Sequence, residues 1–174
     1  MQNITLIDCD FSDAAAILEI FNDAIVNSTA LYDYKCWDMD IMRQWFATKA
    51  AGNYPIIGAI NADGRLVGFA SYGAFRIRPA YKYTIENSLY VHKDFRGQGI
   101  GKILLAETIE RATQQDYHCI IAVIDAANPT SIAMHQKQGF VEVGVFKQVG
   151  FKFGQWLDAA FYQKTLATPA HPTE

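Results

Sequence analysis

A short glycine-rich segment constrains the fold more than any other stretch of the 174-residue chain. It reads RGQGIGK over residues 96–102, and it lies between the stretch YTIENSLYV and a segment whose apolar residues recur with helical spacing. β-Branched and aromatic residues favour a strand before it, and the apolar periodicity favours a helix after it. The segment therefore predicts a strand, a tight turn and a helix in direct succession.

The same segment predicts an anion site. Its three glycines stand at alternate positions and remove side chains from the turn, so backbone N–H groups there can approach an anion closely. The helix start adds about half a positive charge, and Arg96 and Lys102 add full charges. A turn without a ligand is the simpler alternative, but three glycines behind an arginine exceed what a turn requires. We therefore expect a diphosphate to bind here.

Two common nucleotide motifs do not fit this segment. A Walker A loop needs Ser or Thr where Ile103 stands, and a dinucleotide GxGxxG needs glycine where Lys102 stands. The diphosphate is therefore expected to belong to another kind of ligand.

The remaining elements follow from apolar periodicity and turn residues. We expect strands over residues 4–9, 54–60, 65–73, 83–91, 119–124, 140–146 and 156–166, and helices over residues 14–26, 39–51, 100–112 and 129–138. Ser12 or Asp13 is expected to cap the first helix and Asp38 the second. This order predicts an α/β fold with a mixed sheet, unlike a doubly wound fold. We expect one domain over residues 1–166 and a flexible tail over residues 167–174.

Composition excludes several classes of protein. A net charge of −3 argues against nucleic-acid binding. No apolar run reaches the roughly 18 residues of a membrane span, and the N-terminus lacks a signal-peptide pattern. Three distant cysteines indicate reduced thiols in a cytoplasmic protein, and the scattered histidines and cysteines predict no metal site.

The pattern Arg96-x-x-Gly99-x-Gly101 resembles the acetyl-CoA pyrophosphate loop of the GCN5-related N-acetyltransferases (GNAT). An apolar strand end before the loop and the later pattern NxxSxxxHxxxGF over residues 128–140 extend the resemblance to roughly residues 3–166. The resemblance implies a mostly antiparallel, twisted central sheet that splays at a β-bulge and carries helices on both faces. It also implies acetyl-CoA as co-substrate.

Several segments resemble one branch of this superfamily, the phosphinothricin and methionine sulfoximine acetyltransferases. They are YTIENSLYVHKDFRGQGIG, NPTSIAMHQKQGF, QVGFKFGQWLD and NSTALYDY. This resemblance implies N-acetylation of a small amino acid such as phosphinothricin, methionine sulfoximine or methionine sulfone, by a homodimer. A GNAT enzyme for another amine, such as a protein N-terminus or an aminoglycoside, and a non-catalytic acyl-CoA-binding module remain alternatives.

The resemblance implies two catalytic residues. Glu86 matches the family's general base, and period-2 alternation puts it on the same strand face as Ser88 and Tyr90. Without the resemblance, a strand carboxylate in an ordinary hydrogen bond would be the favoured interpretation. His135 is expected to protonate the leaving thiolate or to bond the sulfur region, with packing under its helix as the alternative.

The coenzyme is expected to bind mainly through backbone groups. A bulge in the strand would leave N–H and C=O groups for the pantetheine amides and the thioester oxygen. Asn128 is expected to bond the pantetheine arm, with an N-cap role as an equal alternative. The full expected set is Leu89, Tyr90, Val91, Arg96, Gly97, Gln98, Gly99, Ile100, Gly101, Lys102, Asn128 and Ser131.

The acceptor is expected to bind near two arginines. The guanidinium groups of Arg76 and Arg78 match a carboxylate or phosphinate in a bidentate manner, although solvated surface charge is the more common fate of a loop arginine. Tyr32 and Phe75 are expected to wall the acceptor pocket, with core packing as the alternative.

Overall fold

The computed structural model describes residues 3–174, which divide into two compact units. One unit comprises residues 3–71 and 88–105, and the other comprises residues 72–87 and 106–174. The single domain expected over residues 1–166 stays a prediction. The strands are β1 (Thr5–Asp8), β2 (Ile56–Ile60), β3 (Leu66–Ala74), β4 (Thr84–Val91), β5 (Cys119–Asp125), β6 (Val141–Lys152) and β7 (Gln155–Thr165). The α-helices are α1 (Ala14–Asn27), α2 (Met39–Ala51), α3 (Ile100–Gln114) and α4 (Pro129–Lys137).

The element order agrees with the predicted one. The seven strands are ordered β1-β2-β3-β4-β5-β7-β6. β4 and β5 are parallel, whereas the pairs β1–β2, β2–β3, β5–β7 and β6–β7 are antiparallel. The predicted α/β fold with a mixed, mostly antiparallel sheet is therefore confirmed.

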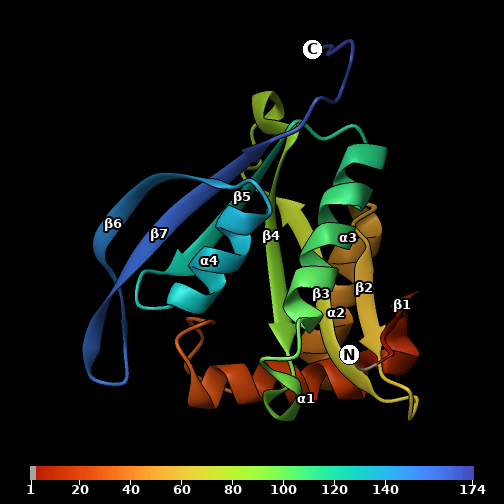
Figure 1. The fold of residues 1–174 in the computed structure, drawn as a ribbon, viewed down its shortest axis with the longest axis vertical. Coiled ribbons are helices and arrows are strands. Elements are labelled where there is room, and N and C mark those ends of the chain that lie inside the picture. Colours follow the sequence, from red (N-terminus) through yellow and green to blue (C-terminus); the bar gives the residue numbers. More distant parts are fainter. Residues whose placement is uncertain (1–2) are drawn as a thin grey trace. The chain divides into compact units, whose positions relative to one another are not determined.

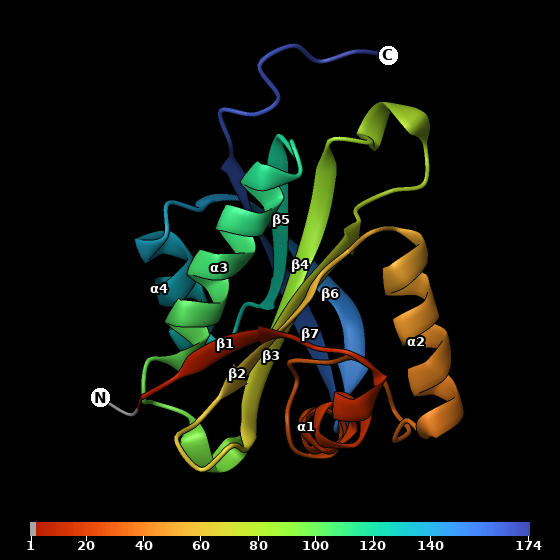
Figure 2. The ribbon, with the colours of Figure 1, turned by 90° about the vertical axis from the view of Figure 1, so that its right-hand side faces the viewer.

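Helices cover both faces of the strands in the first unit. Ile56 and Phe69 pack in one apolar cluster with α1 and α2, whereas their neighbours Ile57 and Ala70 pack in a second cluster with the first turns of α3. Adjacent strand residues point to opposite faces, so each strand serves both clusters. Figure 2 shows α1 and α2 on one side of β2 and β3 and the start of α3 on the other.

The predicted caps and turn of the first unit have mixed outcomes. Asp38 caps α2, because its carboxylate accepts from the N–H groups of Asp40 and Ile41 at 3.0 and 2.9 Å. The four residues between the strands expected over 54–60 and 65–73 form a turn, Asn61–Gly64, with Gly64 at φ 77°. Asp13 stands at the N-cap position of α1, as one of the two expected residues, but its side chain makes no cap bond there: its carboxylate accepts from the Asp10 N–H, because a 3-10 turn, Phe11–Asp13, precedes the helix.

The second unit carries a long β6–β7 hairpin (Figure 1). β6 runs to Lys152 and so exceeds the strand expected over residues 140–146. A register shift between Phe146 and Gly150, with Gln148 at φ 56°, lets the pairing with β7 resume beyond the predicted end. Two residues of the expected tail are hydrogen-bonded, Thr168 to Tyr117 and Thr173 to Tyr83, and the tail's flexibility stays a prediction. Of the helices in the described chain, none has the length and apolar character that crossing a membrane requires.

Candidate functional site

The glycine segment connects β4 to α3 through a 3-10 turn, Lys93–Phe95. Gly97 and Gly99 have φ angles of 77° and 84°, a left-handed backbone that favours glycine. A Cβ atom built on either residue would meet nothing within 4 Å. The left-handed backbone therefore explains why glycine stands at these two positions, and the space beside them is open to a ligand.

The start of α3 leaves N–H donors without partners in the helix. The first helical bonds run from the N–H groups of Lys102 and Ile103 to the Gly99 carbonyl, at 3.1 and 3.3 Å. The N–H groups before them have no partner within the helix. Ile100 is buried with Leu104 in the second apolar cluster, which fixes where the helix begins. An anion placed here would meet N–H donors and the positive end of the helix.

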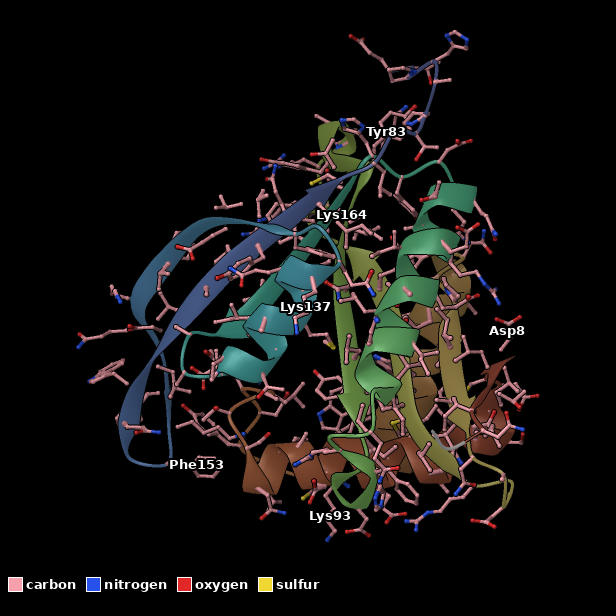
Figure 3. All side chains as sticks on the ribbon, in the orientation of Figure 1. Asp8, Tyr83, Lys93, Lys137, Phe153 and Lys164 are labelled. Carbon is pink, nitrogen blue, oxygen red and sulfur yellow. The ribbon has the colours of Figure 1, made fainter. Side chains whose placement is uncertain are left out.

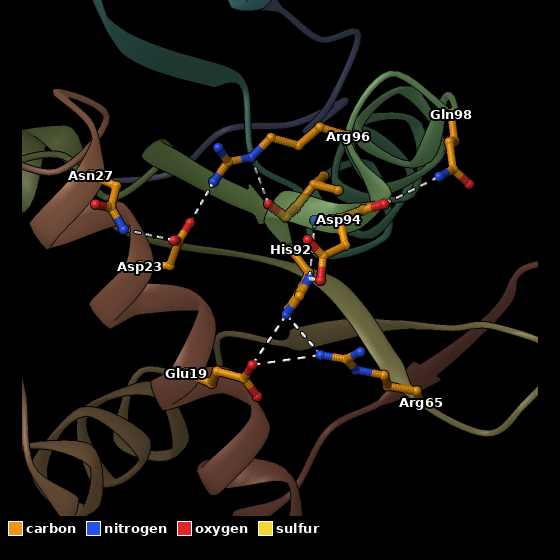
Figure 4. Close-up of polar contacts among 9 residues, drawn as sticks. Glu19, Asp23, Asn27, Arg65, His92, Asp94, Arg96 and Gln98 are labelled. Atoms are coloured by element: carbon orange, nitrogen blue, oxygen red, sulfur yellow. Dashed lines mark hydrogen bonds and ion pairs between the residues drawn. The ribbon is translucent and has the colours of Figure 1, made fainter.

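Arg96 bonds two elements outside the glycine segment, α1 and the end of β4. Its Nη2 lies 2.9 Å from Asp23 Oδ2 on α1, and its Nε donates to the Val91 carbonyl at 3.1 Å (Figure 4). Lys102 and Gln98 are exposed, and the Gln98 amide reaches the Asp94 carbonyl at 3.5 Å. The Arg96 guanidinium carries five N–H donors, so others remain beyond the two that bond Asp23 and Val91.

The side chains of the strand end are used in packing. Leu89 and Val91 pack against the second cluster, and Tyr90 packs against both Phe21 and Phe69, with ring centroids 5.1 and 5.5 Å away. Any ligand contact at residues 89–91 therefore falls to the main chain. The expected bulge stays a prediction.

Glu86 lies where β4 pairs with β5. It is half-buried and stands opposite Ile121, the third residue of the parallel register. Its neighbours Ile85 and Asn87 are buried and face the other side of the strand. Glu86 therefore shares its strand face with Ser88, as the alternation predicts.

His135 is buried in the second unit, with 3% of its surface exposed. Its Nδ1 lies 2.9 Å from the Ser131 carbonyl, which can only accept, so Nδ1 carries the proton. Its Nε2 must then accept, and Asn87 Nδ2 lies 3.3 Å away. Burial lowers the pKa of His135, against a smaller opposing effect of the Ser131 carbonyl. The ring is thus neutral at pH 7, with both nitrogens engaged.

Asn87 has one atom without a partner. Its Oδ1 is the buried side-chain oxygen or nitrogen that lacks a hydrogen bond among residues 3–174. Turning the amide over would not help, because it would put oxygen against the accepting Nε2 of His135. A buried acceptor without a donor costs about 1–3 kcal/mol, so this oxygen indicates a donor from water or a ligand.

Asn128 caps α4, which is one of the two roles expected for it. Its side-chain oxygen accepts from the Ser131 N–H at 3.0 Å, directly before Pro129. The bond orients Asn128 and begins the helix that carries His135. Its expected contact with the pantetheine arm stays a prediction.

The loop after β3 brings two predicted acceptor residues together. The Arg76 guanidinium lies 4.6 Å from the Phe75 ring centroid, and the Phe75 ring meets Tyr81 edge-on at 5.8 Å. Arg76 and Arg78 are both exposed. The pair can therefore receive an anion from solvent without first breaking a buried ion pair.

Tyr32 lies in the other unit, on the loop between α1 and α2. That loop is fixed by Asn22, which donates to the Trp37 carbonyl at 3.0 Å and accepts from the Trp37 N–H at 2.8 Å. Tyr32 itself is 40% exposed, so its predicted contact with an acceptor is compatible with its surface position.

Asp23, Glu19 and Asn87 were absent from the expected set. Asp23 meets Arg96 across 73 positions of sequence, so no local pattern points to it. Asn87 did carry a signal, since period-2 alternation puts this polar residue on the same strand face as the apolar residues Ile85 and Leu89. Among residues 3–174, no group of three or more His, Cys, Asp or Glu side chains is arranged to hold a metal ion.

Comparison with known proteins gives a consistent result. A family profile described as "Acetyltransferase (GNAT) family" matches residues 16–140. The chain is 42% identical over 159 residues to the L-methionine sulfoximine/L-methionine sulfone acetyltransferase of Pseudomonas aeruginosa, covering 91% of this chain and 92% of that protein. It is 36% identical over 161 residues to the L-amino acid N-acyltransferase MnaT of Escherichia coli K12, covering 92% and 93%.

Among solved structures, the chain resembles a GNAT superfamily phosphinothricin acetyltransferase from Sinorhizobium meliloti, crystallised in complex with acetyl-CoA. The TM-score is 0.94 at 39% identity, and the match covers 98% of this chain and 94% of that one. The likeness extends over both units.

Proposed function

Because the chain belongs to the acetyltransferase (GNAT) family, we propose that it moves the acetyl group of acetyl-CoA to the amino group of a small amino acid. Methionine sulfoximine, methionine sulfone and phosphinothricin are the acceptors that we name. The relative named for the first two, at 42% identity over 91% of the chain, carries the proposal.

The residues present fit the coenzyme. The arc beside Gly97 and Gly99 is open where a Cβ would otherwise project, which suits a diphosphate held by backbone N–H groups. Gln98, Gly101 and Lys102 complete the set that we assign to the phosphates. The partnerless Oδ1 of Asn87 suits an amide N–H of the pantetheine arm, for which we also propose Asn128, Ser131 and the main chain of residues 89–91. Bound acetyl-CoA supplies the activated thioester.

The remaining roles belong to the chain's own side chains. We assign Glu86 to remove a proton from the acceptor's ammonium group, directly or through a water. Arg76 and Arg78 bind the acceptor's carboxylate or phosphinate, and Tyr32 and Phe75 bound its side chain. His135 donates its N–H to Ser131 and accepts through Nε2 from Asn87, so we assign it to the sulfur end indirectly, by orienting the Asn87 amide.

Thiol release tests the proposal. Purified protein with acetyl-CoA should release thiol with methionine sulfoximine, methionine sulfone or phosphinothricin, and more slowly with ordinary amino acids. A protein N-terminal peptide and an aminoglycoside represent the alternative acceptors. Binding of acetyl-CoA without release by any amine would favour the non-catalytic module and contradict the proposal.

We further propose a homodimer that forms through the β6–β7 hairpin. Exposed apolar side chains gather there: Val141, Val143, Phe146, Val149, Phe153 and Trp156. Figure 3 labels Phe153 at the hairpin tip. An apolar surface of this kind marks an interaction site. Light scattering should give a dimer that Val149→Ser and Phe153→Ser weaken, whereas Val26→Ser, on exposed α1 surface, should not. A monomeric wild type would contradict this.

Three cysteines without disulfide partners support a cytoplasmic location, which we propose on that ground.

A further inference from the structure

Arg96 ties the glycine segment to a helix that the expected site did not include. It stands directly before Gly97, and its guanidinium bonds both Asp23 of α1 and the carbonyl of Val91, the last residue of β4. The Asp23 side chain is only 15% exposed, so water screens the pair less than an ordinary surface ion pair. One side chain therefore joins helix, strand and loop.

Asp23 is itself held in place. Its Oδ1 accepts from Asn27 Nδ2 at 2.9 Å, one turn further along α1, while its Oδ2 bonds Arg96. A carboxylate with both oxygens engaged has one orientation, and so does the guanidinium that it bonds.

A second contact with α1 lies one turn before Asp23. His92 is buried, and its Nδ1 accepts from the Asp94 N–H at 3.3 Å, which caps the 3-10 turn before the loop. Its Nε2 lies 3.1 Å from Glu19 Oε1 and 2.8 Å from Arg65 Nη2. Arg65 Nη2 also lies 3.5 Å from that Glu19 oxygen. Both residues that flank the 3-10 turn, His92 and Arg96, are thus bound to α1 (Figure 4).

We propose that Asp23, with Glu19 in a lesser part, is a positioning residue for the diphosphate loop. Asp23 acts through Arg96 and Glu19 acts through His92 to hold the backbone of residues 96–101 in the shape that presents its N–H groups. The inference rests on the proposed use of acetyl-CoA and adds α1 to the coenzyme site. Glu19 contributes less because it is more exposed than Asp23.

A purely electrostatic effect of Asp23 predicts the opposite change in acetyl-CoA affinity. Asp23 is an anion beside a loop proposed to bind an anion, so removing its charge should strengthen phosphate binding if Arg96 acted only as a positive charge. Positioning predicts weaker binding, because the freed guanidinium no longer orders the loop. The sign of the change therefore separates the two accounts.

Asp23→Asn is the test. Calorimetry with acetyl-CoA should give a Kd about tenfold above that of the wild type, while the KM for the acceptor stays unchanged. In the ligand-free protein, the amides of Lys102 and Ile103, which donate to the Gly99 carbonyl, should exchange hydrogen faster. Asp40→Asn is the matched control: it removes an exposed ion pair with Arg43 on α2 and should change neither readout.

A tighter or unaltered Kd together with unaltered amide exchange would overturn the inference. If the wild type failed to bind acetyl-CoA, the proposed function would fall, yet the exchange measurement would still test the α1 contacts. Should Asp23→Asn not fold, Arg96→Lys keeps the charge but cannot reproduce the two-sided contact. Positioning then predicts the same rise in Kd, and wild-type affinity would refute it.

Discussion

Replacing Gly99 by alanine separates the cost of backbone strain from the loss of a binding surface. Gly99 has φ 84°, so an L-residue there is strained by about 1–2 kcal/mol. For a chain of this size, that strain lowers Tm by about 2–8 °C. Gly64, in the β2–β3 turn, has φ 77° and is equally open to an added Cβ. Gly64→Ala should therefore lower Tm by a similar amount.

Only the first substitution should affect the coenzyme. A methyl group at Gly99 fills the open arc, and even one lost hydrogen bond between an N–H group and a phosphate weakens binding about tenfold. Calorimetry should give a Kd for acetyl-CoA at least about tenfold higher in Gly99→Ala and nearly unchanged in Gly64→Ala. Equal affinities in the two variants would show that the arc does not bind the diphosphate.

Three further predictions address the remaining groups. Glu86→Gln should lower kcat about a hundredfold or more with little change in acetyl-CoA affinity, and wild-type turnover would exclude Glu86 as the base. Arg76→Ala should raise the acceptor KM about tenfold, whereas Arg43→Ala on exposed α2 should not; a KM unmoved by the first change would assign Arg76 to surface charge. Burial lowers the pKa of His135, so the unfolded chain takes up its proton first, and the free energy of unfolding should fall as the pH drops below 6.5. Urea titrations at two pH values should find that fall reduced in His135→Gln, and an equal fall in both proteins would contradict the assignment.

Local signals predicted most of the fold. The Asp38 cap and the Asn61–Gly64 turn depend on a few neighbouring residues, and both are present as expected. The end of β6 was misjudged because the bulge at Gln148 interrupts the alternation that marks a strand. Asp13 occupies the expected N-cap position of α1 without a side-chain bond, because the capping carboxylate of the preceding 3-10 turn is Asp10.

The candidate site was predictable only where its chemistry is local. The glycine spacing indicated an anion loop because positive φ angles and open backbone leave a signature in the residues themselves. The bond between Asp23 and Arg96 leaves no such signature, since it forms only after α1 and the loop meet. The contact between His135 Nε2 and Asn87, a residue 48 positions away, likewise leaves no local pattern.

The two hydrogen bonds between Asn22 and Trp37 have a consequence for changing the enzyme's preference by mutagenesis. Asn22 fixes the loop that carries Tyr32, and the adjacent Asp23 bonds Arg96. Neighbouring positions of one helix thus support two different loops, so a substitution at either position would be pleiotropic. On the acceptor contact proposed for Tyr32, libraries that seek new acceptors should leave residues 19–23 intact, keep Leu31, which packs against the α1 cluster, and diversify the rest of residues 29–35.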